Sequence, residues 1–365
     1  MKKIYYITAV FATLFLVGCG DGIDLPGVNV ETDLNKIPLP DNNVNLEQVE
    51  LKPSTEPMLH EGLHTEEDFQ RIRGKKAAGE EPWASAYQLL VESQFSQKTA
   101  DTYPTEWIKR GVSGDENYMN AARGATIAYQ QALRWKIEQD DEYAAKAVEN
   151  LNKWVQTCVG VTGNTNLSLA AGLYGYEFAI AGELLRDYGG WDRADFAAFQ
   201  NWLLKVFYPA NDDFLKRHHD TNALHYWANW CLCNIAAKMA IGIVTDRRDI
   251  YNEGIAHLQT GDTNGRLRRA IYHDYAPDYN FAQWQESGRD QGHTLMCVGL
   301  MGVICQLAWS QGDDFFAYDD NLFLRACEYA ACCNYTNETV PYTTYIWQKQ
   351  SQWGYPIPEE QTTLG

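Results

Sequence analysis

Two groups of polar side chains lie beside apolar stretches and could carry acid–base chemistry. The first contains Asn222, His225 and Asn229, which share one face if a continuous helix runs through them. The second contains Arg289 and His293. Imidazole titrates near neutral pH, and guanidinium stays charged. Together these groups could move a proton and hold an anion.

A tyrosine and a loop of aromatic and amide residues lie between the two groups. Tyr272 follows three arginines that begin at Arg266. A phenol has a pKa near 10, and nearby cations lower it, so Tyr272 is a candidate acid or base. Arg266 is also a candidate ligand-binding residue, and the loop adds further candidates: Tyr279, Gln283, Trp284, Gln285 and Glu286.

Each of these groups also has a purely structural interpretation. A histidine between aromatic residues, such as His225, is often a core residue, and an arginine run is often a solvated face. Asp290 suits the N-cap of a helix, with Arg289 as its ionic neighbour. A functional interpretation requires the helix ends near residues 222 and 290 to meet at one rim.

Apolar residues three and four positions apart predict the helices that would position these groups. The helices form antiparallel pairs of roughly 50 residues without a strand signal between them, which favours an all-α, incomplete (α/α) toroid. The segment 222–244 is apolar on all sides and should be an inner helix. A capping box at Thr65 and Asp68, Pro82 and Asp192 mark helix starts. The predicted helices cover 121–135, 144–158, 169–184, 196–206, 222–244, 248–258, 293–310 and 322–333.

The charge balance excludes several classes of protein. The 365 residues include 30 Lys and Arg against 48 Asp and Glu, a net charge of −18, which argues against a nucleic-acid partner. The apolar fraction of 45% argues against a disordered polyanion. The eight cysteines from Cys158 to Cys333 lack metal-ligand spacing, so we expect free thiols, no metal site and no cofactor.

The first residues predict an export signal. Two lysines precede the apolar run 4–17, which is too short for a permanent membrane span, and the ending at Cys19 is similar to a bacterial lipoprotein signal. We therefore expect a signal peptide over 1–19, a tether over 20–57 and one domain over 58–365. No later segment is expected to span a membrane. The expected protein is a monomer, lipid-anchored at Cys19 in the cell envelope, facing the periplasm or the exterior.

Several runs together resemble the alginate-lyase domain family. The most specific is Gln-Glu-Ser-Gly-Arg-Asp-Gln-Gly-His-Thr at 285–294, and the resemblance extends over about residues 60–345. The sequence His-Tyr-Trp-Ala-Asn-Trp at 225–230 is similar to the gut-bacterial branch that acts on polymannuronate or glucuronan. The resemblance implies an α/α toroid, and family domains normally continue past residue 365 through a basic, aromatic segment and a helix. Further matching runs are 121–154, 171–186, 264–272 and 308–313.

The resemblance implies β-elimination on an acidic polysaccharide that contains uronates. This reaction needs a group that neutralises the C6 carboxylate, a base for the C5 proton and an acid for the leaving O4. We assign Asn222, Arg289 and His293 to the carboxylate, His225 to the base and Tyr272 to the acid. Alternatively, Tyr272 serves as both acid and base and His225 neutralises the carboxylate, or Tyr279 replaces Tyr272. Candidates to stack on sugar rings are Trp227, Trp230 and Trp284, with core packing as the alternative for the first two.

Two other functions compete with the lyase. A glycoside hydrolase on the same scaffold would use paired carboxylates such as Glu286 and Asp290. A non-catalytic glycan-binding lipoprotein would keep the aromatic residues without needing the Asn, His, Arg and Tyr set. The sequence leaves the uronate polymer open, as well as cleavage from the ends or within the chain.

Overall fold

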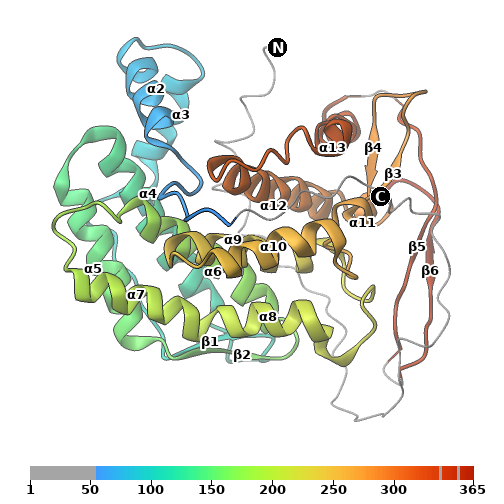
Figure 1. Cartoon of the computed structure of the whole chain (residues 1–365), viewed down its shortest axis with the longest axis horizontal. Coiled ribbons are helices and arrows are strands. Elements are labelled where there is room, and N and C mark those ends of the chain that lie inside the picture. The colour runs from blue at the N-terminus through green and yellow to red at the C-terminus, as the bar shows by residue number, and fades with distance from the viewer. Residues whose placement is uncertain (1–54, 337–338, 352–353) are drawn as a thin grey trace.

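The computed structural model describes residues 55–336, 339–351 and 354–365, and its helices form two layers (Figure 1). Along the chain, one or two outer helices separate successive inner helices, which confirms the predicted incomplete α/α toroid. Every residue of the inner helix α9 is buried. The inner helices are α4 (Tyr118–Glu138), α6 (Leu167–Leu184), α9 (Ala228–Val244) and α12 (Gln291–Ser310). The outer helices are α5 (Asp141–Thr157), α7 (Arg193–Val206), α8 (Tyr208–Arg217), α10 (Arg248–Thr260) and α13 (Tyr318–Tyr335).

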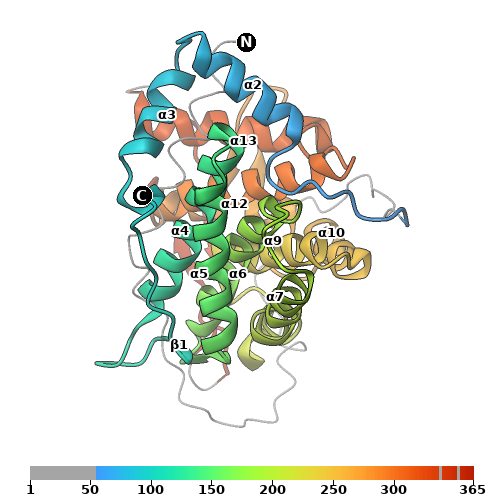
Figure 2. The ribbon, with the colours of Figure 1, turned by 90° about the vertical axis from the view of Figure 1, so that its left-hand side faces the viewer.

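Three inner helices begin at the same end of the barrel. Asn234 of α9 donates from Nδ2 to the main-chain oxygen of Ser168 in α6, over 3.2 Å. Asn229 of α9 places Nδ2 3.7 Å from Sδ of Met296 in α12. The loops that lead into α6, α9 and α12 therefore gather at one rim, which lies on the right in Figure 1 and on the far side of the molecule in Figure 2.

The helix starts follow the capping residues that the sequence contains. Thr65 and Asp68 form the predicted capping box of α2 (Glu66–Ala77), and Pro82 precedes α3 (Trp83–Glu92). The Asp192 side chain accepts from the N–H of Ala194 at the start of α7. These caps satisfy N–H groups that have no partner within the helix.

The expected absence of strands is wrong for the described residues. Three short pairs occur, each with strands of three or four residues. Strands this short contain too few residues for alternation to be visible in a sequence. The parallel pair is β1 (Trp107–Arg110) with β2 (Gly160–Gly163), and the antiparallel pairs are β3 (Ile271–Asp274) with β4 (Ala282–Trp284), and β5 (Tyr345–Trp347) with β6 (Glu359–Gln361).

The predicted helix over 222–244 begins six residues late, at Ala228. Asn222 Oδ1 accepts from the N–H of Leu224, a local turn that competes with helical bonding. Asn264 also donates from Nδ2 to the main-chain oxygens of Leu224 and Tyr226. Asn222 and His225 therefore lie in an irregular loop, and the helical face they were expected to share with Asn229 does not exist.

The helix α12 meets the length and mean-hydropathy criteria of a membrane span, contrary to the expectation for the segments after residue 17. It packs against α9 and α13 as a core helix. The prediction of free thiols is confirmed for all eight cysteines of the described residues, and five of them are buried. Cys19, the signal peptide and nearly all of the tether lie outside the described residues.

Candidate active site

Residues 342–350 lie over Asn222 and His225 at the rim. Nδ1 of His225 accepts from the main-chain N–H of Gln350 over 2.9 Å, and its main-chain oxygen accepts from Nε1 of Trp347 over 2.8 Å. The main-chain N–H of Asn222 donates to Oε1 of Gln350 over 2.7 Å. The exposed fractions of Asn222 and His225 are only 5% and 6%. A segment far along the chain thus holds and covers both residues.

The His225 ring is neutral and has a defined tautomer. A main-chain N–H can only donate, so Nδ1 is unprotonated and the proton sits on Nε2. Burial, with a smaller contribution from the Lys349 ammonium, lowers the pKa of His225 to about 4. At neutral pH this imidazole therefore presents an N–H donor at Nε2.

Tyr272, in β3, has a hydrogen-bonded hydroxyl group beneath the same segment. Its hydroxyl donates to the main-chain oxygen of Thr343 and accepts from Nε2 of Gln283 over 3.1 Å. Burial raises the pKa of Tyr272 above its usual range, and neighbouring tyrosines, Tyr342 first, add to the effect. The phenol is therefore protonated at neutral pH, and in this state it can serve as an acid.

Gln285 and Glu286 connect the rim to α9 and to Arg289. They lie in the 3-10 turn η6 (Gln285–Gly288), where Oε1 of Gln285 accepts from the N–H of Ala228 over 2.8 Å. Arg289 forms an ion pair with Glu286, whose pKa is raised by burial although His293 and Arg289 oppose the shift. The Arg289 side chain keeps 27% exposure, so its guanidinium can still reach a bound anion.

His293 lies in the first turn of α12. Its Nδ1 is 2.7 Å from a carboxylate oxygen of Asp290, which also caps the helix by accepting from the His293 N–H. Partial burial acts to raise the pKa of Asp290, but the hydrogen bonds from His293 lower it below the usual value. The carboxylates of Glu286 and Asp290 are thus both engaged with cationic or imidazole partners.

Four side chains form a row that joins residues 342–350 to η6. The indole rings of Trp227 and Trp347 stack with centroids 4.7 Å apart, and the Arg289 guanidinium lies 5.0 Å from the Trp227 ring. The Lys349 ammonium lies 5.0 Å from the Trp347 ring. Cation–π and stacking contacts of this kind stabilise the row. Since Trp227 is only 5% exposed, it has no free face for a sugar in this state.

The side chains that residues 342–350 contact form the rim group, namely Asn222, His225, Trp227, Tyr272 and Gln285. Other predicted ligand-binding residues lie away from this group. Trp230 packs on Tyr226 with ring centroids 4.7 Å apart, and Trp284 donates from Nε1 to the main-chain oxygen of Ala326 in α13. Both tryptophans are core residues, and the sugar-stacking role does not fit their burial. Tyr279 is 54% exposed, and its ring packs on Tyr275, with centroids 6.4 Å apart.

The arginine run 266–269 is more than a solvated face. Arg268 forms an ion pair with Asp319, and Asp274 lies between Arg268 and Arg325. These ion pairs attach β3, and with it Tyr272, to α13. Arg266 immediately precedes the short helix α11 (Leu267–Ala270) and is partly buried.

Sequence reasoning missed the contribution of residues 342–350 to the site. The run Thr-Tyr-Ile-Trp at 344–347 consists of β-branched and aromatic residues typical of a strand, and this is the available signal. It indicates an element but not the partners that the element contacts. The residues that contact the rim group are Thr343, Tyr345, Trp347, Gln348 and Gln350.

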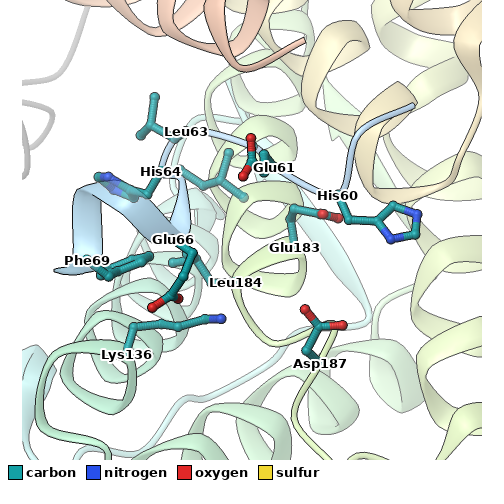
Figure 3. Close-up of a pocket in the computed structure, with 12 residues that line it drawn as sticks. His60, Glu61, Leu63, His64, Glu66, Phe69, Lys136, Glu183, Leu184 and Asp187 are labelled. Carbon is teal, nitrogen blue, oxygen red and sulfur yellow. The ribbon is translucent and has the colours of Figure 1, made fainter. Parts of the chain in front are cut away.

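A separate cavity of about 240 Å³ lies at the opposite end of the barrel, near the C-terminal ends of α6 and α9. Figure 3 shows Lys136, Glu183 and Asp187 around it. No rim residue lines it. Within residues 55–336, 339–351 and 354–365, no three His, Cys, Asp or Glu side chains are grouped as metal ligands.

Comparisons with known proteins point to one family. The family model described as alginate lyase matches residues 77–338. A variant of alginate lyase A1-III complexed with a tetrasaccharide is similar at a TM-score of 0.57 and 14% identity, covering 78% of this chain and 82% of that chain. A search of curated proteins finds no match.

Two further solved structures have the same fold. Alginate lyase A1-III from Sphingomonas species A1 has a TM-score of 0.53 and 13% identity, covering 76% of this chain and 80% of that one. An alginate lyase from Bacteroides ovatus has a TM-score of 0.53 and 15% identity, and the match covers 74% of this chain and 82% of that chain.

Proposed function

Because the chain belongs to the alginate lyase family and is therefore a polysaccharide lyase, we propose that it cleaves polymannuronate or glucuronan by β-elimination at the rim. The residues that carry the reaction are Asn222, His225, Tyr272, Arg289 and His293. The observation that supports this site most strongly is a juxtaposition of two groups. A neutral imidazole donor and the hydroxyl group of Tyr272 lie beneath one segment, residues 342–350.

Neutralisation of the substrate carboxylate falls to His225, Asn222, Arg289 and His293. A charged C6 carboxylate keeps the adjacent C5 proton weakly acidic, so donors to that carboxylate stabilise the transition state. The hydrogen bond from Gln350 to Nδ1 leaves Nε2–H of His225 as a donor, which supports neutralisation rather than proton abstraction. Of the two roles considered for His225, we propose that it donates a hydrogen bond to the substrate carboxylate.

Tyr272 then serves both proton transfers. In mannuronate and glucuronate, the C5 proton and O4 lie on the same side of the ring. The phenolate form of Tyr272 takes the C5 proton, the C4=C5 double bond forms, and the C4–O4 bond breaks. The proton that Tyr272 took from C5 passes to the departing O4, so that the tyrosine returns to the phenolate form. The products are a new reducing end and a 4,5-unsaturated uronate.

Substrate entry requires a local rearrangement. Tyr272 is 5% exposed, and its hydroxyl contacts the main-chain oxygen of Thr343. A uronate ring that reaches Tyr272 must therefore displace Thr343. The exposed part of Arg289 offers the incoming carboxylate a first charged contact.

The hydrolase alternative is less well supported. A retaining or inverting hydrolase needs one protonated carboxyl and one free carboxylate beside the scissile bond. Glu286 is buried against Arg289, and Asp290 is engaged by His293. Neither carboxylate is available without breaking those contacts.

The test is incubation of the purified protein with polymannuronate, polyguluronate, glucuronan and hyaluronan. A lyase product absorbs ultraviolet light through its C4=C5 double bond, whereas hydrolysis leaves no such chromophore. We expect absorbance to rise with polymannuronate or glucuronan. Binding to all four polymers without any absorbance change would support the glycan-binding alternative instead.

We also propose that the protein is anchored in the cell envelope through lipidated Cys19. The basis is the sequence of residues 1–19. Metabolic labelling with a fatty acid should mark the wild-type protein and fail to mark Cys19→Ser. Equal labelling of both proteins would contradict the anchor.

A further inference from the structure

Gln350 contacts both Asn222 and His225. Its side-chain Oε1 accepts from the main-chain N–H of Asn222 over 2.7 Å, and its own main-chain N–H donates to Nδ1 of His225 over 2.9 Å. Gln350 is 5% exposed, and so it makes these contacts away from solvent. One residue thus sets the position of two rim residues.

The local pairing of the backbone explains why the Gln350 N–H is available for a side chain. Gln350 forms an isolated antiparallel bridge with Pro356. The two main-chain hydrogen bonds of this bridge are made by the residues before and after Gln350. The N–H of Ile357 donates to the oxygen of Lys349, and the N–H of Ser351 donates to the oxygen of Tyr355. The N–H between them points away from this pairing and meets His225.

We propose that Gln350 is a positioning residue of the reaction, which holds Asn222 and fixes His225 as the tautomer with its proton on Nε2. The role of Asn222 and His225 in the reaction rests on the proposed function. The tautomer of His225 can be measured without any activity. Gln350 does not touch the substrate. It acts through His225 and Asn222.

The physical reason is preorganisation. Neutral imidazole exchanges its proton between Nδ1 and Nε2, and only the second form donates from Nε2. When the imidazole proton is already on Nε2, the donor needs no rearrangement as charge develops on the substrate. Displacement of such a group by about 1 Å can lower a rate by about 100-fold.

The kinetic test compares Gln350→Met with Thr344→Ala, a change at an exposed position on the same segment. Gln350→Met keeps the side-chain length and the main-chain N–H but loses the acceptor for Asn222. We expect kcat on polymannuronate to fall by roughly 10- to 100-fold while KM changes less than about threefold, with Thr344→Ala like wild type. Wild-type kcat in Gln350→Met would overturn the proposal.

The spectroscopic test needs no substrate. In ¹⁵N-histidine-labelled protein at pH 7, the His225 signals, assigned by their loss in His225→Gln, should show a protonated Nε2 and an unprotonated Nδ1. Gln350→Pro lacks the N–H donor and should shift the Nδ1 signal or mix the tautomers. A wild-type ring protonated on Nδ1 would overturn the proposal. Failure of the proposed function is a different result, namely a wild-type protein that cleaves no uronate polymer.

Discussion

The indole rings of Trp227 and Trp347 stack at 4.7 Å with an angle of 27° between their planes, although one precedes α9 and the other belongs to β5. Nε1 of Trp347 also donates to the main-chain oxygen of His225. Through this pair, a strand near residue 347 is attached to the loop that carries Asn222 and His225. The shape of the site therefore depends on a contact between distant parts of the sequence.

We expect Trp347→Ala to lower the free energy of unfolding by up to about 3 kcal/mol, because it removes a stacked ring and a hydrogen-bond donor. The matched control is Trp309→Ala, since Trp309 is 54% exposed. Urea unfolding measures both changes. Equal midpoints for the two variants would contradict the importance of the stack.

Tyr272→Phe should abolish formation of unsaturated product, because the phenol oxygen carries both proton transfers. The fold should persist, since only one hydroxyl group is lost. Tyr279→Phe is the control, because that side chain is 54% exposed outside the rim group. Absorbance assays and circular dichroism follow the two effects. Activity that is kept in the first variant and lost in the second would move the role to Tyr279.

The pH dependence of the lyase should follow the ionisation of Tyr272. Burial raises the pKa of this phenol above its ordinary value of about 10, so at pH 7 only a small fraction is phenolate. We therefore expect kcat/KM on polymannuronate to rise from pH 7 to pH 9, approaching tenfold per pH unit. A flat profile over this range would mean that another group takes the C5 proton.

Arg289→Ala should reduce kcat/KM on uronate polymers by roughly 10- to 100-fold, through loss of a charge-assisted hydrogen bond of about 1.5–3 kcal/mol. Arg217→Ala is the matched control, since that side chain is 57% exposed and paired with Asp213 on α8. Steady-state kinetics on both variants test the assignment. Similar losses in the two variants would indicate an effect of net charge alone.

Glu177, in α6, should make stability fall as pH rises. Its Oε2 is buried without a hydrogen-bond partner among the described residues, and burial raises its pKa to about 8. A raised carboxyl pKa gives stability that is complete below the unfolded value, near 4.5, and is lost as pH rises through 8.

Glu177→Gln removes this ionisation. The variant should match wild type at pH 4.5 and exceed it in free energy of unfolding at pH 9, by on the order of 5 kcal/mol. The exposed Glu360→Gln provides the control. A difference that stays constant between pH 5 and pH 9 would contradict the buried acid.

The inner helices could be predicted because burial imposes a pattern on neighbouring residues. Leu169, Leu173 and Tyr176 repeat at helical spacing, and all three are buried in α6. Short-range caps such as Asp192 are equally visible, since cap and partner lie two or three residues apart. These features depend only on local sequence.

The arrangement of the site could be predicted only in part. The sequence identified His225 and Tyr272 by residue type, but the loop at 222–227 escaped prediction because the bonds from Asn264 that hold it come from far along the chain. The role of Gln350 was invisible for the same reason. A pattern within one segment contains no information about which backbone N–H will meet which imidazole.

The order of translation has a consequence for when Asn222 and His225 gain their partners. The inner helices α4, α6 and α9 are complete once residue 244 has been synthesised, whereas the hydrogen bonds to Asn222 and His225 come from residues 348–350. A nascent chain can therefore build most of its barrel while the rim pair still lacks its partners. The ribosome must add residues 348–350 before Asn222 and His225 have the hydrogen-bond partners described above.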